Sequence, residues 1–198
     1  LQADVRKAEA IDATVKLTAL EQVSAAFNWV VREVRLEETS LIPTPPQFVL
    51  RRGRGTALQR SIIFLELLRQ FNLDSDTPSS YPGCLFIEPG DGQDKPDRVL
   101  GVGVVIDKEL YMFDPGLGLP IPGPDGKGVA TLAQAVKEPG ILGQLTVNEK
   151  VPYDVKLERL QKSEPRLCVS LSALAPRLVY LQKEVLAPGV RVNLAADY

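Results

Sequence analysis

The side chains with the clearest capacity for chemistry lie at two places along the chain. Thr56 begins a helix predicted over residues 56–71, and Ser61 follows one turn later. Asp114 ends an apolar run and is followed by Pro115. A hydroxyl becomes a nucleophile when a general base takes its proton, and histidine is the most frequent base. The chain contains no histidine, so a hydroxyl nucleophile would have no imidazole to activate it.

Thr56 and Asp114 each have a structural role that the sequence predicts instead. Threonine is favoured at helix N-caps, where its hydroxyl accepts a first-turn N–H. An aspartate at a turn accepts hydrogen bonds from the backbone that follows it. We therefore expect Thr56 to cap the helix and Asp114 to stabilise a turn. The alternative is a remodelled site in which Thr56, Asp114 and Arg54 surround a substrate.

Four arginines form a basic patch before and within the predicted helix. They are Arg51, Arg52, Arg54 and Arg60. Such a patch beside a helix N-terminus could hold a carboxylate or phosphate, although arginines with acidic neighbours more often form a solvated or ion-paired surface. Aromatic residues are not interleaved with them, as they would be at a single-stranded nucleic-acid site.

No cofactor or metal site is predicted. The segment Gly101-Val102-Gly103 lacks the third glycine of a dinucleotide fingerprint, and Gly126-Lys127-Gly128 lacks the hydroxyl residue of a P-loop. The acidic loop 91–97 does not have EF-hand spacing, and no Cys/His cluster is present. Cys84 and Cys168 lie in strand-like runs and are interpreted as buried free thiols, with a disulfide between them as the alternative.

The elements that would position these residues follow from apolar periodicity and turn residues. Helices are predicted over 3–15 and from Thr18 to Val34, the second beginning with a Thr18/Glu21 capping box. Residues 41–46 contain three prolines and predict an extended connector that continues through Phe48 to a glycine turn. The helix over 56–71 is apolar around most of its surface and should be the central helix, with a narrow polar strip at Gln59, Arg60, Glu66 and Gln70.

Strands are predicted after this helix, joined by polar or glycine-rich segments. Asp107 and Lys108 should turn the chain between two of them, and Thr131 should cap a short helix. Residues 115–128 predict a long surface loop. The predicted strands are 83–88, 99–106, 109–113, 166–171 and 190–194, and a last helix covers 172–186.

Together these segments resemble the transglutaminase-like (papain-related) core over residues 48–119. The resemblance rests on Gly55 two residues before Ala57, on the buried helix ending in Arg69, and on the strand pair ending in Asp114-Pro115. In that family a cysteine at the helix N-terminus is the nucleophile, a histidine on the sheet is its base, and an aspartate orients the histidine. The helix dipole and the imidazole together stabilise the thiolate.

The resemblance implies a degenerate site. Ala57 occupies the cysteine position, and the histidine position falls near Leu100 or Gly101. Asp114 is retained, but an aspartate that orients a histidine has no catalytic function without one. The sequence therefore predicts a catalytically inactive domain, or pseudoenzyme.

The predicted fold class is α+β, with a mostly antiparallel sheet packed on the central helix. We expect one domain over 1–198, with its core at 48–119, a helical part at 1–40, and residues 150–198 as an extension of the same core. The chain begins at Leu1 without methionine, so we expect a piece of a larger, bacterial protein. No apolar run approaches the roughly 20 residues that span a bilayer.

Three functions are consistent with the sequence. The preferred one is an inactive module that binds a protein or peptide partner, or other domains of the same chain. The alternatives are a hydrolase or transferase with a remodelled site around Thr56 and Asp114, and an anion- or nucleic-acid-binding module through Arg51–Arg60. The formal net charge of −2 gives no general attraction to nucleic acid. Cytoplasmic and extracytoplasmic locations both remain open.

Overall fold

The fold is built on a five-stranded antiparallel sheet, seen in a computed structural model that describes residues 17–38, 44–71, 81–90, 96–138, 140–148 and 152–167. The strand order is β6-β5-β4-β3-β7. The α+β class and the antiparallel sheet are thereby confirmed. The strands are β3 (Gly83–Glu88), β4 (Arg98–Ile106), β5 (Glu109–Asp114), β6 (Leu119–Pro120) and β7 (Glu164–Leu167).

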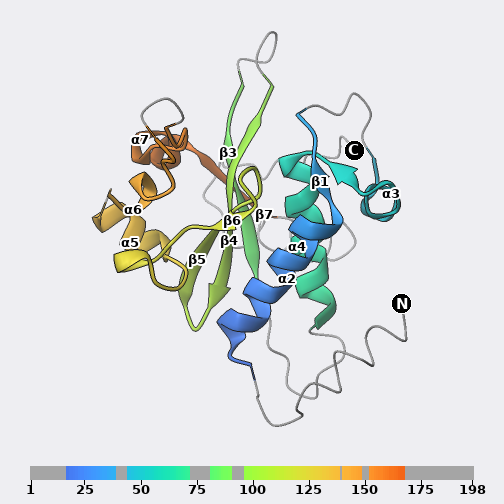
Figure 1. The fold of residues 1–198 in the computed structure, drawn as a ribbon, viewed down its shortest axis with the longest axis horizontal. Helices are drawn as coiled ribbons and strands as arrows, with labels where there is room; N and C mark the ends of the chain where they lie inside the picture. Colours follow the sequence, from blue (N-terminus) through green and yellow to red (C-terminus); the bar gives the residue numbers. More distant parts are fainter. Residues whose placement is uncertain are drawn as a thin grey trace, which may run out of the picture.

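Two helices cover one face of the sheet. These are α2 (Ala19–Glu33), which begins with the predicted Thr18/Glu21 capping box, and α4 (Ala57–Phe71). Phe27 of α2, Phe64 of α4 and Phe113 of β5 form a buried aromatic cluster, with ring centroids 5.0 to 5.4 Å apart. The predicted central helix therefore packs on the sheet as expected, with α2 beside it (Figure 1).

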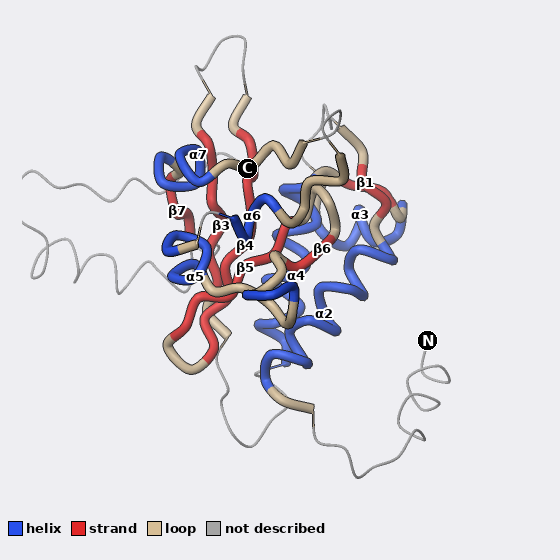
Figure 2. The backbone as a smooth tube through the Cα atoms, turned by 60° about the vertical axis from the view of Figure 1, so that its left-hand side comes forward, coloured by secondary structure: helices blue, strands red, loops and turns tan. Residues whose placement is uncertain are grey.

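The opposite face of the sheet is also covered, which the sequence did not predict. Three short helices lie there: α5 (Leu132–Lys137), α6 (Gly140–Gly143) and α7 (Leu157–Lys162). Side chains alternate between the two faces of a strand, so Phe113 enters the first core and Met112 enters the second. The sheet lies between two helical layers (Figures 1 and 2).

The hairpin between β4 and β5 closes as predicted at Asp107 and Lys108. Both residues have positive φ angles, 50° and 71°, as the mirror-image turns of two-residue hairpins require. Residues 115–128 are more structured than a surface loop. They contain β6 and a short 3₁₀ turn (Pro124–Gly126), because Phe113 and Asp114 continue the ladder to Pro120 and Leu119.

The segment before α4 contains a helix that the sequence did not predict, and it begins at the last residue of the predicted extended connector, residues 41–46. α3 covers Pro46–Arg52, and its first residue is a proline. Proline is tolerated there because the first turn of a helix does not use its N–H groups. Gly53, with φ 66°, ends α3 in a left-handed conformation.

A small parallel ribbon connects these parts. β1 (Arg35–Leu36) pairs with β2 (Arg54–Gly55), immediately after α2 and immediately before α4. In the described part of the chain, none of the helices combines the length and the apolar character needed to cross a bilayer. The predicted helices over 3–15 and 172–186 and the strand over 190–194 lie outside the described residues.

Candidate functional site

The hydroxyls of Thr56 and Ser61 both form hydrogen bonds with the backbone of α4. The Thr56 Oγ1 accepts a hydrogen bond from the Gln59 N–H at 3.3 Å, and the Gln59 Oε1 accepts one from the Thr56 N–H at 3.0 Å. This is a capping box, and it confirms Thr56 as the N-cap. The Ser61 Oγ donates to the Ala57 carbonyl at 2.7 Å. Ala57 itself is the first residue of the helix, so the side chain at the leading end of α4 is an unreactive methyl group.

Gly55 is required by packing directly ahead of this helix end. A Cβ atom at Gly55 would lie 2.7 Å from Val49 Cγ1 and 3.1 Å from Val34 Cγ1. Real Cβ contacts are rarely so short. The glycine that supported the family resemblance therefore allows α3, the end of α2 and the start of α4 to approach one another.

Arg60 is buried, contrary to its predicted place on a polar strip and in a basic patch. The residue is 7% exposed. Its Nε donates to the Val34 carbonyl at 2.7 Å, and its Nη1 donates to the Pro115 carbonyl at 2.9 Å. Burial lowers the pKa of the guanidinium because removal from water disfavours the charged form. Arg60 thus connects α4 to the end of α2 and to the turn after β5.

Asp114 stabilises a turn, as predicted, but it also has a partner that the sequence did not indicate. Its Oδ1 accepts from the N–H groups of Gly116 at 2.7 Å and Leu117 at 2.9 Å. Its Oδ2 accepts from the Tyr153 hydroxyl at 2.8 Å. Tyr153 is 39 residues away in the sequence and in no recognisable motif, so no local signal could have identified it.

The environment of Tyr153 keeps its hydroxyl protonated. Burial raises the pKa of Tyr153, and the negative charge of Asp114 raises it further. The tyrosine therefore remains a hydrogen-bond donor to Asp114 at neutral pH and cannot accept a proton there.

The three positions carried over from the family do not converge on one face of the sheet. Phe113 faces α2 and α4, and alternation places the Asp114 side chain on the opposite face. The Tyr153 hydroxyl meets it on that opposite face. A Cβ atom at Gly101 would lie 3.9 Å from Met112 Cε in the second core, so Gly101 shares the face of Asp114. Ala57 belongs to the helix on the other face.

The other three arginines of the predicted patch lie on the surface, whereas Arg60 is buried. Arg52 forms an ion pair with Glu37 and donates to the Arg54 carbonyl from Nε at 3.3 Å and from Nη2 at 3.1 Å. Arg51 and Arg54 are exposed. Arg35 is the register partner of Arg54 across the β1–β2 ribbon. The two residues are too far apart in the sequence for the sequence to connect them.

The described ranges contain no group of three or more His, Cys, Asp or Glu side chains that could hold a metal ion. Cys84 is buried and free, and burial raises the pKa of its thiol. Cys168 lies outside the described residues.

Known proteins do not supply a family for this chain. Comparison with family profiles, curated proteins and solved structures gave no significant match in any of the three.

Proposed function

We propose that this chain is a catalytically inactive domain that serves as a binding or structural module of a larger protein. Its likeness to the transglutaminase-like core is one of element order and not of site geometry, because Ala57 lies on one side of the sheet and Gly101 and Asp114 on the other. The observation that supports this most directly is the structural use of the polar groups at the candidate positions. Thr56, Arg60 and Asp114 each make hydrogen bonds that hold backbone segments in place. Ala57, at the position reserved for a nucleophile, has no reactive atom.

The surroundings of Asp114 support the same conclusion. In a Cys-His-Asp arrangement the aspartate accepts a hydrogen bond from an imidazole. Here the donor is the Tyr153 hydroxyl, whose raised pKa makes it a poor general base at neutral pH. Asp114 therefore has a tyrosine hydroxyl, and not an imidazole, as its side-chain donor.

The alternative of a hydrolase or transferase around Thr56 and Asp114 has less support. Such a site needs the hydroxyl and the carboxylate within reach of one substrate. The Thr56 hydroxyl accepts the Gln59 N–H at the start of α4, while the Asp114 carboxylate belongs to the other face of the sheet.

The test is an activity screen of the purified chain with acyl donors, amine donors, peptides and esters. We expect no turnover above the buffer rate. The variants to compare are Thr56→Ala and Asp114→Ala, with Thr131→Ala as a matched control. Thr131 caps α5 through the same kind of capping box with Gln134, so it reproduces the loss of a cap at a different place.

Turnover that Thr56→Ala or Asp114→Ala abolishes, and that Thr131→Ala leaves intact, would overturn the proposal. Turnover equally present in all three variants would show that neither Thr56 nor Asp114 takes part in it.

A further inference from the structure

The parallel ribbon brings together two arginines from distant parts of the sequence. Arg35 of β1 and Arg54 of β2 are register partners. Neighbouring strands lie roughly 4.8 Å apart, and paired residues project to the same face of a ribbon. Two guanidinium groups therefore extend from adjacent positions in the same direction.

This direction is toward solvent. The other face of the ribbon carries Gly55, whose missing side chain leaves room for Val49 and Val34. At Gly55 that face is buried against the protein, whereas Leu36 beside it is partly exposed, so the face with Arg35 and Arg54 points away from the core. Both arginines are exposed.

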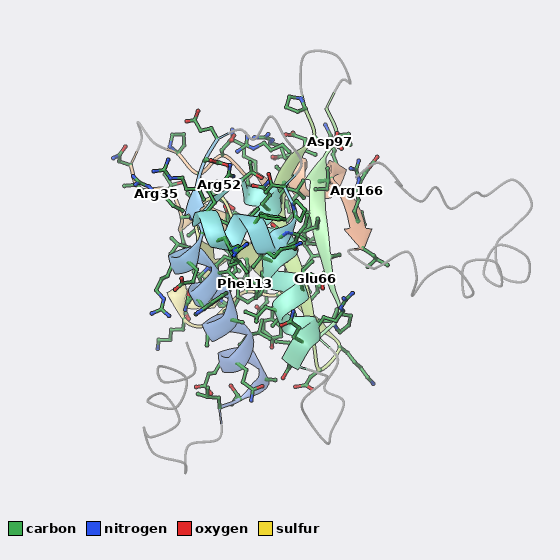
Figure 3. The ribbon with its side chains drawn as sticks, turned by 90° about the vertical axis from the view of Figure 1, so that its right-hand side faces the viewer. Arg35, Arg52, Glu66, Asp97, Phe113 and Arg166 are labelled. Atoms are coloured by element: carbon green, nitrogen blue, oxygen red, sulfur yellow. The ribbon has the colours of Figure 1, made fainter. Side chains whose placement is uncertain are left out.

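α3 extends this surface. Phe48, Arg51 and Arg52 lie at helical spacings of three and four residues and are all exposed, whereas Val49 is buried. Arg52 reaches Glu37 of the segment after β1 and the carbonyl of Arg54, which makes the helix and the ribbon one continuous surface. We call Arg35, Phe48, Arg51, Arg52 and Arg54 the arginine face. Figure 3 shows Arg35 and Arg52 on the same side, far from the Arg166–Asp97 pair.

Three of the four arginines on the arginine face form no ion pair with the described residues. Glu37 forms its ion pair with Arg52. Among the ion pairs within the described ranges, none involves Arg35, Arg51 or Arg54. The chain as a whole carries a formal charge of −2, so this surface is opposite in sign to the molecule that carries it.

We propose that the arginine face docks an acidic segment of a partner protein. The guanidinium fork binds carboxylates through two parallel hydrogen bonds, and Arg35 and Arg54 can each engage one carboxylate of an extended chain. Phe48, which is 51% exposed, offers an apolar contact at the edge of the same surface. Aromatic residues and arginine are more frequent in protein–protein interfaces than on the rest of the protein surface.

A protein partner fits these residues better than a nucleic acid. Binding to a single strand relies on several stacked aromatic rings and a broad basic groove, and the arginine face has one ring. This inference goes beyond the proposed function, because it holds whether or not the chain has catalytic activity.

The experiment is a nuclear magnetic resonance titration of the ¹⁵N-labelled chain with a Glu-rich peptide containing one leucine. The same peptide with Gln in place of Glu is the uncharged control. The expected result is selective shifts of the Arg35 and Arg54 Nε–H signals, which decrease when salt is raised because screening weakens exposed charge contacts. The Gln peptide should cause no such shifts.

Two double variants with equal changes in charge give the decisive comparison. Arg35→Glu with Arg54→Glu should weaken binding by about tenfold or more. Lys137→Glu with Lys162→Glu, exposed positions on α5 and α7, should leave binding unchanged. If the amide spectrum of the first variant shows loss of fold, Arg35→Gln with Arg54→Gln replaces it, and Lys137→Gln with Lys162→Gln becomes the control of equal charge.

Equal weakening by both double variants would overturn the proposal, because it would reflect net charge alone. It would also be overturned if the Glu-rich peptide caused no shifts at millimolar concentration, or if a single-stranded oligonucleotide bound the same arginines more tightly than the peptide.

Discussion

Replacement of Arg60 by methionine tests how the buried guanidinium contributes to stability. Methionine retains much of the volume of the side chain and removes the charge and both donors. The carbonyl groups of Val34 and Pro115 would then lose the hydrogen bonds that they accept at 2.7 and 2.9 Å. These two carbonyls come from different segments, so the change affects the contact of α4 with both.

Two opposing terms decide the magnitude. A hydrogen bond from a charged donor contributes about 1.5–3 kcal/mol, and a buried acceptor left without a donor costs a similar amount. Removal of the guanidinium also recovers the cost of burying a charge, which can reach several kcal/mol. We expect the two lost bonds to outweigh this recovery and the free energy of unfolding to fall by about 3 kcal/mol.

The measurement is urea denaturation followed by circular dichroism. Arg69→Met is the matched control, because Arg69 is on the same helix and forms an exposed pair with Glu66. Exposed pairs contribute about 0–1 kcal/mol. Arg60→Lys keeps the charge without the fork geometry and should fall between the parent and Arg60→Met. A parent-like or higher stability of Arg60→Met would refute the reasoning, since burial of the charge would then cost more than its hydrogen bonds contribute.

Three further predictions concern other buried groups. Tyr153→Phe should lower the free energy of unfolding by about 1.5–3 kcal/mol, because Asp114 loses a donor. The pKa of Tyr153 is raised in the folded chain, so its contribution to stability is complete below the unfolded tyrosine pKa of about 10 and is lost as the pH rises above that value. The free energy of unfolding at alkaline pH should therefore depend less on pH in Tyr153→Phe than in the parent. Cys84 should be alkylated slowly at pH 8 in the folded chain and fast in urea, because its thiol is buried and has a raised pKa. Peptide mass spectrometry measures the two rates, and equal rates would contradict the burial of Cys84. Gly55→Ala should lower the free energy of unfolding, measured by thermal unfolding, by about 1–3 kcal/mol, because the added Cβ meets neighbouring valines. Gly143→Ala is the control and should change stability little, because a Cβ there meets nothing within 4 Å. Equal effects of the two variants would show that Gly55 is not closely packed.

Local signals in the sequence were sufficient for the elements that depend on neighbouring residues. The Thr18 and Thr56 caps, the Asp107-Lys108 turn and the turn at Asp114 each involve hydrogen bonds or backbone angles within a few residues. The apolar arc of α4 likewise reflects the residues of the helix itself. α3 was missed because prolines before a helix and prolines in an extended segment look alike in a sequence.

The tertiary structure decided which distant residues meet. The sequence predicts Arg60 as a polar position on a helix. Its burial is explained by the carbonyl acceptors that the end of α2 and the turn after β5 provide. The Tyr153–Asp114 bond and the Arg35–Arg54 pair join residues that no spacing rule connects. The absence of histidine was decided by the sequence alone, because no fold can supply an imidazole. Which groups surround a carboxylate or a guanidinium depends on contacts between segments far apart in the chain, and those contacts exist only after folding.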